Sequence, residues 1–303
     1  MNKDFLSLSD WSLEDLESIF ALTRELKQKQ KEGTPHHLLK GQTLGMIFEK
    51  SSTRTRVSFE VGMFQLGGHA LFLHSGTTQM GRGEPIKDTA RVMSGYCDGV
   101  MARTYSHKAL EEFAEHSYVP VINGLSDLYH PCQLVADIFT VTEHKDDFRN
   151  LKYCWIGDGN NMANSWINAA AVAGFELRIA TPKGYEPDDN IVALAEKTGA
   201  KILLTNDPRE AAEGVDVLNT DVWASMGHEA EQEKRMKAFS GFQINTELVK
   251  LADPEAVVMH CLPAHRDEEI TDEVVEGAQS IIFAEAENRL HVQKAILATL
   301  MAR

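Results

Sequence analysis

The sequence predicts an α/β protein with two domains, each built around a parallel β-sheet. Short apolar runs alternate with segments of helical spacing along most of the chain, which is the pattern of parallel α/β folds. A length of 303 residues exceeds one typical domain and suits two. A charged connector, KDDFRN at Lys145–Asn150, interrupts the alternation before it restarts. We therefore expect one domain over residues 1–145 and a second over residues 150–287.

The N-terminal half is expected to begin with a helix and to continue with strand–helix pairs. Apolar residues recur at helical spacing over Leu13–Lys31. Ser12 stands three residues before Asp15, the spacing of a capping box with Asp in place of the usual Glu. A second helix should follow the first strand and extend to about Leu66, where a pair of glycines ends it. Strands are expected at four apolar runs: Leu44–Phe48, Ala70–Leu73, Gly99–Ala102 and Val119–Ile122.

The C-terminal half repeats this alternation after the connector. Helical spacing is found in three segments: Asn164–Ala173, Asp189–Thr198 and Asn288–Met301. Strands are expected at six apolar runs: Tyr153–Ile156, Glu176–Ala180, Lys201–Leu204, Val215–Asn219, Val257–His260 and Ser280–Phe283. We see no internal repeat and no low-complexity tract.

Composition and charge exclude several classes of protein. The net charge of −15 argues against a broad nucleic-acid surface, because phosphate backbones are bound by clustered Lys and Arg. The chain contains no uncharged apolar stretch of about 18 residues, the length that a membrane-spanning helix needs. The N-terminus lacks the apolar core of a secretory signal. Four cysteines are too few and too scattered for a disulfide framework in a chain of this length. We expect reduced cysteines and a cytoplasmic protein.

The segment Ser51–Arg56 (SSTRTR) lies between a predicted buried strand and a predicted helix. A loop that opens a helix presents unpaired backbone N–H groups and the positive end of the helix dipole, and both favour an anion. The hydroxyl residues add donors, and Arg54 and Arg56 add planar forks that can grip phosphate oxygens. This predicts a phosphate site. The alternative is an ordinary Ser/Thr-capped helix with two surface arginines.

The segment His130–Gln133 (HPCQ) lies between a predicted strand and an amphipathic helix over Leu134–Val141. Proline is favoured just inside a helix start, which would place His130 at the cap, where its side chain can face a cleft. A fixed imidazole there could stabilise charge on a carbonyl oxygen. The alternative is a satisfied structural histidine, the more common role of a lone His.

The sequence contains partial matches to two other kinds of site, a nicotinamide-binding turn and a metal site, and neither match is complete. Trp155–Asn161 (WIGDGNN) has a Gly-x-Gly turn after a strand, but it lacks the third glycine and a clear ribose-binding acid, so we expect no nicotinamide cofactor. His260, Cys261 and His265 could be read as metal ligands. Zinc sites usually assemble four ligands at recognisable spacing, and no partner pair is evident, so we expect no metal.

Several of these motifs together resemble one family. The segment FEKSSTRTRVSFE is similar to the carbamoyl-phosphate signature of the aspartate and ornithine carbamoyltransferases, HPCQ is similar to their HPxQ motif, and MAR at residues 101–103 matches an arginine at a strand end. In the second half, DGNN, DVWASMG and HCLP resemble the ornithine-type members. The resemblance runs in order from Leu6 to the end of the chain.

The resemblance implies a set of functional residues. Carbamoyl phosphate would be contacted by Ser52, Thr53, Arg54, Thr55, Gln79, Arg103, His130, Gln133, Cys261, Leu262 and Arg289. Ornithine would be contacted by Asn161, Asp221, Ser225 and Met226. The catalytic residues would be Arg54, Arg103, His130 and Cys261, with Gln79 reaching into a neighbouring subunit. Arg56 more often holds the loop in this family, and Ala284 stands where the family usually has an aspartate.

The resemblance also implies the reaction. The carbamoyl group of carbamoyl phosphate would pass to the δ-amine of L-ornithine, giving L-citrulline and phosphate in arginine metabolism, with no cofactor. It implies two domains joined by helices, a C-terminal helix over 288–303 that packs back on the first domain, and a homotrimer or multiple of trimers. The alternatives are a carbamoyltransferase for putrescine or an N-acylornithine, a catalytically silent assembly subunit, and a nicotinamide oxidoreductase.

Overall fold

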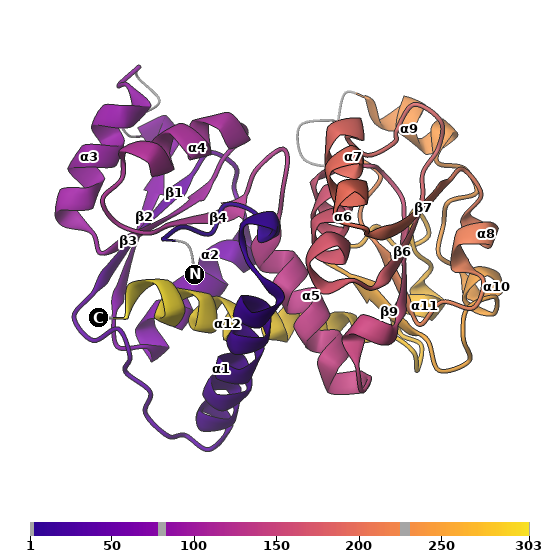
Figure 1. The fold of residues 1–303 in the computed structure, drawn as a ribbon, viewed down its shortest axis with the longest axis horizontal. Coiled ribbons are helices and arrows are strands. Elements are labelled where there is room, and N and C mark those ends of the chain that lie inside the picture. The colour runs from indigo at the N-terminus through magenta and orange to yellow at the C-terminus, as the bar shows by residue number, and fades with distance from the viewer. Residues whose placement is uncertain (1–2, 78–82, 225–230, 303) are drawn as a thin grey trace. The chain divides into compact units, whose positions relative to one another are not determined.

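The computed structural model describes residues 3–77, 83–224 and 231–302. The chain divides into two compact units (Figure 1). Unit 1 comprises Met1–Ala136 and Asn288–Arg303, and unit 2 comprises Asp137–Glu287. The divisions therefore fall inside two helices, α5 (Pro131–His144) and α12 (Ile282–Met301).

Unit 1 contains a four-stranded parallel sheet of strand order β2-β1-β3-β4, which confirms the parallel α/β prediction. The strands are β1 (Thr43–Phe48), β2 (His69–His74), β3 (Gly99–Arg103) and β4 (Val121–Leu125). The helices between them are α2 (Thr53–Gln65), α3 (Ile86–Tyr96) and α4 (His107–His116). Because β2 and β3 flank β1 on opposite sides, the loops after β1 and β3 diverge at the carboxyl edge, where open α/β sheets bind ligands.

The first long helix, α1 (Leu13–Lys31), begins as the sequence predicts. The Ser12 hydroxyl accepts from the backbone N–H of Asp15 at 3.1 Å, and the Asp15 carboxylate accepts from the backbone N–H of Ser12 at 3.1 Å. The capping box is therefore complete, and it satisfies two backbone donors that the helix itself leaves without partners.

The last helix, α12, packs closely on α2 within unit 1 (Figure 1). A Cβ added at Gly62 of α2 would lie 3.3 Å from Cγ of Lys294, so the glycine allows the close approach. The helix begins at Ile282 rather than at the predicted Asn288. The strand predicted at Ser280–Phe283 is wrong: Ser280 forms only an isolated bridge with Val258. A four-residue apolar run cannot by itself distinguish a strand from the start of a helix.

Unit 2 contains a five-stranded parallel sheet of order β7-β6-β5-β8-β9. The strands are β5 (Lys152–Ile156), β6 (Glu176–Ala180), β7 (Lys201–Thr205), β8 (Val217–Thr220) and β9 (Val257–His260). The helices are α6 (Asn161–Ala173), α7 (Asp189–Lys197), α8 (Pro208–Ala212), α9 (Gln232–Ala238), α10 (Thr246–Val249) and α11 (Asp272–Val275). In this order, β6 and β7 lie on one side of β5, and β8 and β9 lie on the other. The segments that follow β5 and β8 are therefore neighbours.

The core of unit 2 explains why the central strand is so apolar. Tyr153 and Trp155 of β5 are almost fully buried, and the ring of Tyr153 lies 5.2 Å from Trp166 and 4.2 Å from Phe175. Strands covered by helices on both faces bury both sets of side chains, which is why they read as continuous apolar runs. No helix among the described residues is long and apolar enough to cross a membrane.

Candidate active site

The predicted phosphate loop opens helix α2 of unit 1. Ser52 is the N-cap, and its side chain accepts from the backbone N–H of Thr55 at 3.3 Å. The first turn holds no acidic residue, so the positive end of the helix is not neutralised locally. Thr53 and Arg54 are exposed, and Ser52 is half-buried. This turn can therefore present hydroxyls, backbone donors and a guanidinium to an anion.

Thr55 is the meeting point of two buried arginines. Its hydroxyl oxygen accepts from Nη1 of Arg103 at 3.4 Å and from Nη2 of Arg289 at 2.9 Å. Nη1 of Arg289 also donates to Oε1 of Gln133 at 2.6 Å. All four of these residues are buried. Four sequence-predicted residues from α2, β3, α5 and α12 thus converge, and they place two guanidinium charges at the start of α2.

His130 lies immediately before α5, as the sequence predicts from Pro131. Burial holds the pKa of its imidazole well below the usual value, and the charges of Arg289 and Arg103 lower the pKa further. The ring is therefore neutral at physiological pH. A neutral imidazole can still donate one hydrogen bond toward a carbonyl oxygen, and a low pKa preserves this neutral form.

Arg56 has a different environment from Arg54. Its Nε donates to Oε1 of Glu60 at 2.9 Å, and its guanidinium lies 3.8 Å from the centre of the Phe72 ring. These contacts tie α2 to β2.

In unit 2, two asparagines of the DGNN segment have distinct places. Asn160 caps α6: its side-chain oxygen accepts from the backbone N–H groups of Met162 and Ala163. Its side-chain nitrogen donates to the carboxylate of Asp221 at 3.4 Å. Asn161 begins the helix and is half-buried. The structural role of Asn160 was missed from the sequence, although an Asn directly before a helix is a known capping signal.

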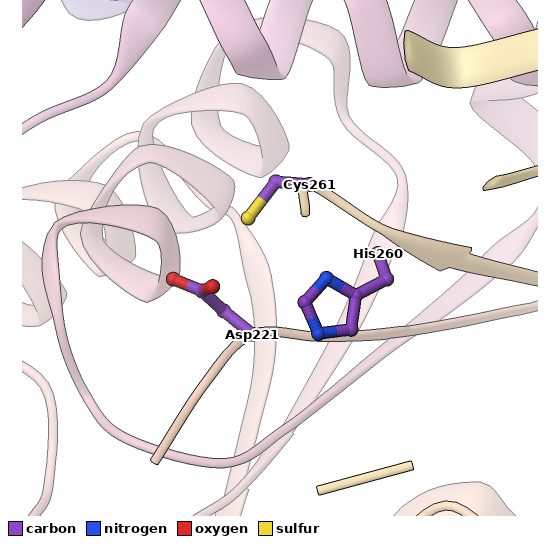
Figure 2. A group of neighbouring side chains, drawn as sticks. All are labelled: Asp221, His260 and Cys261. Atoms are coloured by element: carbon purple, nitrogen blue, oxygen red, sulfur yellow. The ribbon is translucent and has the colours of Figure 1, made fainter. Parts of the chain in front are cut away.

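Cys261 and Asp221 point toward one another in Figure 2, which draws them with His260. Burial raises the pKa of the Cys261 thiol well above its usual value, and the charges of Asp221 and Glu285 raise the pKa further. A hydrogen bond from the thiol to Asp221 acts in the same direction. The sulfur is therefore a neutral thiol near pH 7, and a neutral thiol is a poor nucleophile.

His260 supports the turn that carries Cys261. Its Nε2 lies 3.0 Å from Oε1 of Glu269, and its Nδ1 accepts from the backbone N–H of Leu262 at 2.9 Å. The backbone N–H of His260 itself donates to Glu285 at 2.9 Å. Leu262 has a φ of 57°, an uncommon value for a branched residue. The buried His260 ring thus stabilises a backbone conformation that Leu262 would rarely adopt alone.

These contacts bear on metal binding. One potential ligand atom from each of Asp221, His260 and Cys261 lies within 4.8 Å of the others, so the group resembles a ligand set. Both ring nitrogens of His260 are engaged with protein partners. The histidine could ligate a metal only by giving up one of those hydrogen bonds.

The structure thus brings together Thr55, Arg103, Gln133 and Arg289 in unit 1, and Asp221 with Cys261 in unit 2. Three predicted residues, Gln79, Ser225 and Met226, lie outside the described residues.

Comparisons with known proteins cover the whole chain. The family profile described as "Aspartate/ornithine carbamoyltransferase, carbamoyl-P binding domain" matches residues 3–143, and that of the Asp/Orn binding domain matches residues 149–300. The chain is 69% identical to an ornithine carbamoyltransferase of Syntrophotalea carbinolica, over 100% of both chains. It is 60% identical to one of Geobacter sulfurreducens, over 99% of this chain and 100% of that protein.

A solved structure gives the same result. The ornithine carbamoyltransferase of Pyrococcus furiosus matches with a TM-score of 0.94 and 50% identity, over 98% of this chain and 96% of that chain. With both domain profiles matched in order and with relatives this similar, the chain belongs to the aspartate/ornithine carbamoyltransferase family.

Proposed function

We propose that this protein transfers the carbamoyl group of carbamoyl phosphate to the δ-amine of L-ornithine, giving L-citrulline and phosphate. The observation that carries the proposal is the gathering of the Arg103 and Arg289 guanidiniums on Thr55 at the opening of α2. The names of the relatives, ornithine carbamoyltransferases at up to 69% identity among those compared, support ornithine as the acceptor.

Unit 1 is proposed to bind carbamoyl phosphate. The hydroxyls and backbone donors of Ser52 and Thr53 and the exposed Arg54 would hold the phosphate at the positive end of α2. Arg289 is fixed by Thr55 and Gln133, so its charge is already oriented when the anion arrives. Planar guanidiniums suit phosphate because they donate in pairs.

Attack on the carbamoyl carbon puts negative charge on its oxygen. Arg103 and the neutral His130 are proposed to donate hydrogen bonds to that oxygen, and Gln133 to orient the carbamoyl amide. Donors held in place before the reaction stabilise the transition state without reorganising during it. The low pKa of His130 is compatible with this role, since the neutral ring keeps one N–H that can donate to the oxygen without adding a third buried positive charge.

Unit 2 is proposed to bind ornithine. A free alkylammonium has a pKa of about 10.4, so the nucleophile must lose a proton before it attacks. Asp221 would hold the α-ammonium, and Asn161, Ser225 and Met226 would hold the α-carboxylate end. Cys261 and Leu262 would lie near the reacting δ-nitrogen. The departing phosphate can accept the proton, so no covalent enzyme intermediate is required.

A homotrimer is proposed as the working assembly. The edge strand β2 exposes Leu71, and the neighbouring α2 exposes Val57 and Phe64, the latter at 78%. Helix α3 exposes Val92 and Tyr96, the latter at 77%. At the other edge of this sheet, β4 is bridged by Phe5 through Ile122. Exposed apolar side chains along an open edge are typical of a surface that another subunit covers. Gln79, which lies beyond the described residues, is proposed to reach the neighbouring subunit's site.

The setting is proposed to be arginine metabolism in the cytoplasm. All four cysteines are free and buried, which suits a reducing compartment. A related enzyme of Campylobacter jejuni, 46% identical, is called an anabolic ornithine carbamoyltransferase.

The deciding experiment incubates purified protein with carbamoyl phosphate and ornithine, and measures citrulline and phosphate in parallel. We expect the two products in equal amounts, with putrescine and N-acetylornithine giving little product. Carbamoylation of putrescine at a comparable rate would overturn the choice of acceptor. Absence of both products would overturn the proposal that the protein transfers a carbamoyl group. Light scattering should give a mass three times the 33.7 kDa of one chain, or a whole multiple of that trimer mass.

A further inference from the structure

A buried arginine connects the two segments of unit 2 that carry the proposed ornithine contacts. Arg235 of α9 is only 7% exposed, and its Nη1 donates to Oδ2 of Asp158 at 2.7 Å and to the carbonyl of Trp223 at 2.9 Å. Asp158 is equally buried, so this is an ion pair largely removed from water. Removing one partner of such a pair leaves an uncompensated buried charge.

The two partners of Arg235 lie close in the sequence to two of the proposed ornithine contacts. Asp158 lies in the loop after β5, three residues before Asn161. Trp223 lies after β8, two residues beyond Asp221. One direct contact between these loops is the hydrogen bond of 3.4 Å between Asn160 and Asp221. Arg235 adds a charged connection, made from α9, the helix that follows the Trp223 segment along the chain.

Aromatic packing fixes the guanidinium in place. Its central carbon lies 5.0 Å from the centre of the Tyr185 ring, within the range of a cation–π contact. The ring of Trp223 stacks on Phe239 of the segment after α9, with centroids 5.8 Å apart. The backbone N–H of Gly159 donates to the carbonyl of Tyr185 at 2.8 Å. The DGNN loop, the Tyr185 segment and the segment after β8 therefore meet at Arg235.

We propose that Arg235 is a positioning residue for the second substrate: its bridge between Asp158 and the Trp223 carbonyl sets the spacing of Asn161 and Asp221, and with it the affinity for ornithine. This inference rests on the proposed function. Arg235 touches neither substrate in this scheme. It acts through the two loops, so its loss should affect ornithine and leave carbamoyl phosphate, the proposed ligand of unit 1, nearly unaffected.

The substitution Arg235→Lys tests the idea with least damage. Lysine keeps the charge, but its ammonium cannot reach as far as Nη1 and lacks the rigid fork. We expect the KM for ornithine to rise about tenfold or more, because small errors in substrate placement are costly. The KM for carbamoyl phosphate should change less than about twofold on the same reasoning.

Arg178→Lys is the matched control. Arg178 also joins one carboxylate and one backbone carbonyl, donating to Glu176 at 2.8 Å and to the carbonyl of Glu213 at 2.7 Å. It belongs to β6 and connects none of the ornithine segments. Both variants should lose stability, measured by urea unfolding, but only Arg235→Lys should raise the KM for ornithine selectively.

A second variant protects the test against a folding failure. Asp158→Asn removes the charge but keeps an oxygen that can accept from Arg235, and we expect the same selective rise in the KM for ornithine. If wild type makes no citrulline, the proposed function has failed and not this inference. If wild type is active, equal changes in both KM values would overturn the positioning role. An unchanged KM for ornithine in Arg235→Lys would also overturn it. So would a rise in the KM for ornithine in Arg178→Lys as large as that in Arg235→Lys. If Arg235→Lys does not accumulate as folded protein, Asp158→Asn decides by the same criteria.

Discussion

The hydroxyl of Thr55 accepts a hydrogen bond from Arg289, a residue 234 positions further along the chain, at 2.9 Å. Arg103 donates to the same oxygen. One small side chain therefore orients two guanidiniums that are proposed to receive carbamoyl phosphate. Replacing it tests whether orientation, rather than charge alone, matters at this position.

Thr55→Val keeps the shape of the side chain and removes the acceptor. We expect a loss of about 1–3 kcal/mol in the free energy of unfolding, because buried donors lose their partner. The KM for carbamoyl phosphate should rise and kcat should fall. Thr55→Ser restores the hydroxyl and should recover most of both. Normal kinetics in the Val variant would show that the arginines need no such anchor.

Arg54→Gln should reduce kcat/KM for carbamoyl phosphate by about 10²–10³-fold, the range found when a donor to developing charge is lost. Arg54 is exposed, so the unfolding free energy should hardly change. Arg56→Gln is the neighbouring control. Because Arg56 contacts Glu60 and Phe72, it should keep most of the activity. A larger loss of kcat/KM in Arg56→Gln than in Arg54→Gln would contradict the proposed phosphate loop.

Cys261 should not form a covalent intermediate. Its pKa is raised, so the thiolate is scarce at pH 7–8, and iodoacetamide should alkylate the native thiol much more slowly than the unfolded one. Alkylation should accelerate as the pH rises. Intact mass spectrometry during turnover should find no carbamoyl adduct, and trapping one at Cys261 would refute this assignment.

Lys294 makes the stability of unit 1 depend on pH. It is fully buried, its Nζ contacts Gln65 and His36, and burial lowers its pKa from 10.5 to about 8. A base whose pKa is lower in the folded state binds more protons when unfolded, so stability rises as the pH rises from 8 toward 10.5 and is reduced at lower pH.

Lys294→Met should remove this dependence. Wild type should gain about 2–3 kcal/mol in unfolding free energy relative to the variant between pH 7 and pH 10. His36 contributes little between pH 7 and pH 10, because burial lowers its pKa from 6.5, a value that already lies below this range. Urea unfolding at several pH values provides the measurement, and parallel curves for the two proteins would exclude the buried charge as the cause.

Gly159→Ala should damage the DGNN loop. An added Cβ would lie 2.3 Å from the backbone carbon of Glu186 and the backbone nitrogen of Pro187, so one backbone segment must move. We expect weaker binding of ornithine and lower stability. Gly174→Ala, at a glycine with no atom within 4 Å of the added Cβ but a φ of 79°, should cost stability alone. Equal ornithine kinetics in the two variants would contradict the close-approach argument.

The parallel α/β architecture followed directly from sequence periodicity, because each buried strand and each amphipathic helix has a distinct apolar spacing. The capping box at Ser12 was predicted for the same local reason. The strand expected at Ser280–Phe283 was wrong, since this short apolar run supplies one bridge at Ser280 and then the first turn of α12.

The residues of the candidate site were identified through their motifs, but their partners were not. No spacing rule connects Thr55 with Arg289, or Asp158 with Arg235 across 77 positions. The sequence by itself determined the element order, the parallel sheets and the residue types available for chemistry. Only the tertiary structure decided which of them meet, because strand order brings loops from distant parts of the chain to one sheet edge, where burial sets their hydrogen bonds and pKa values.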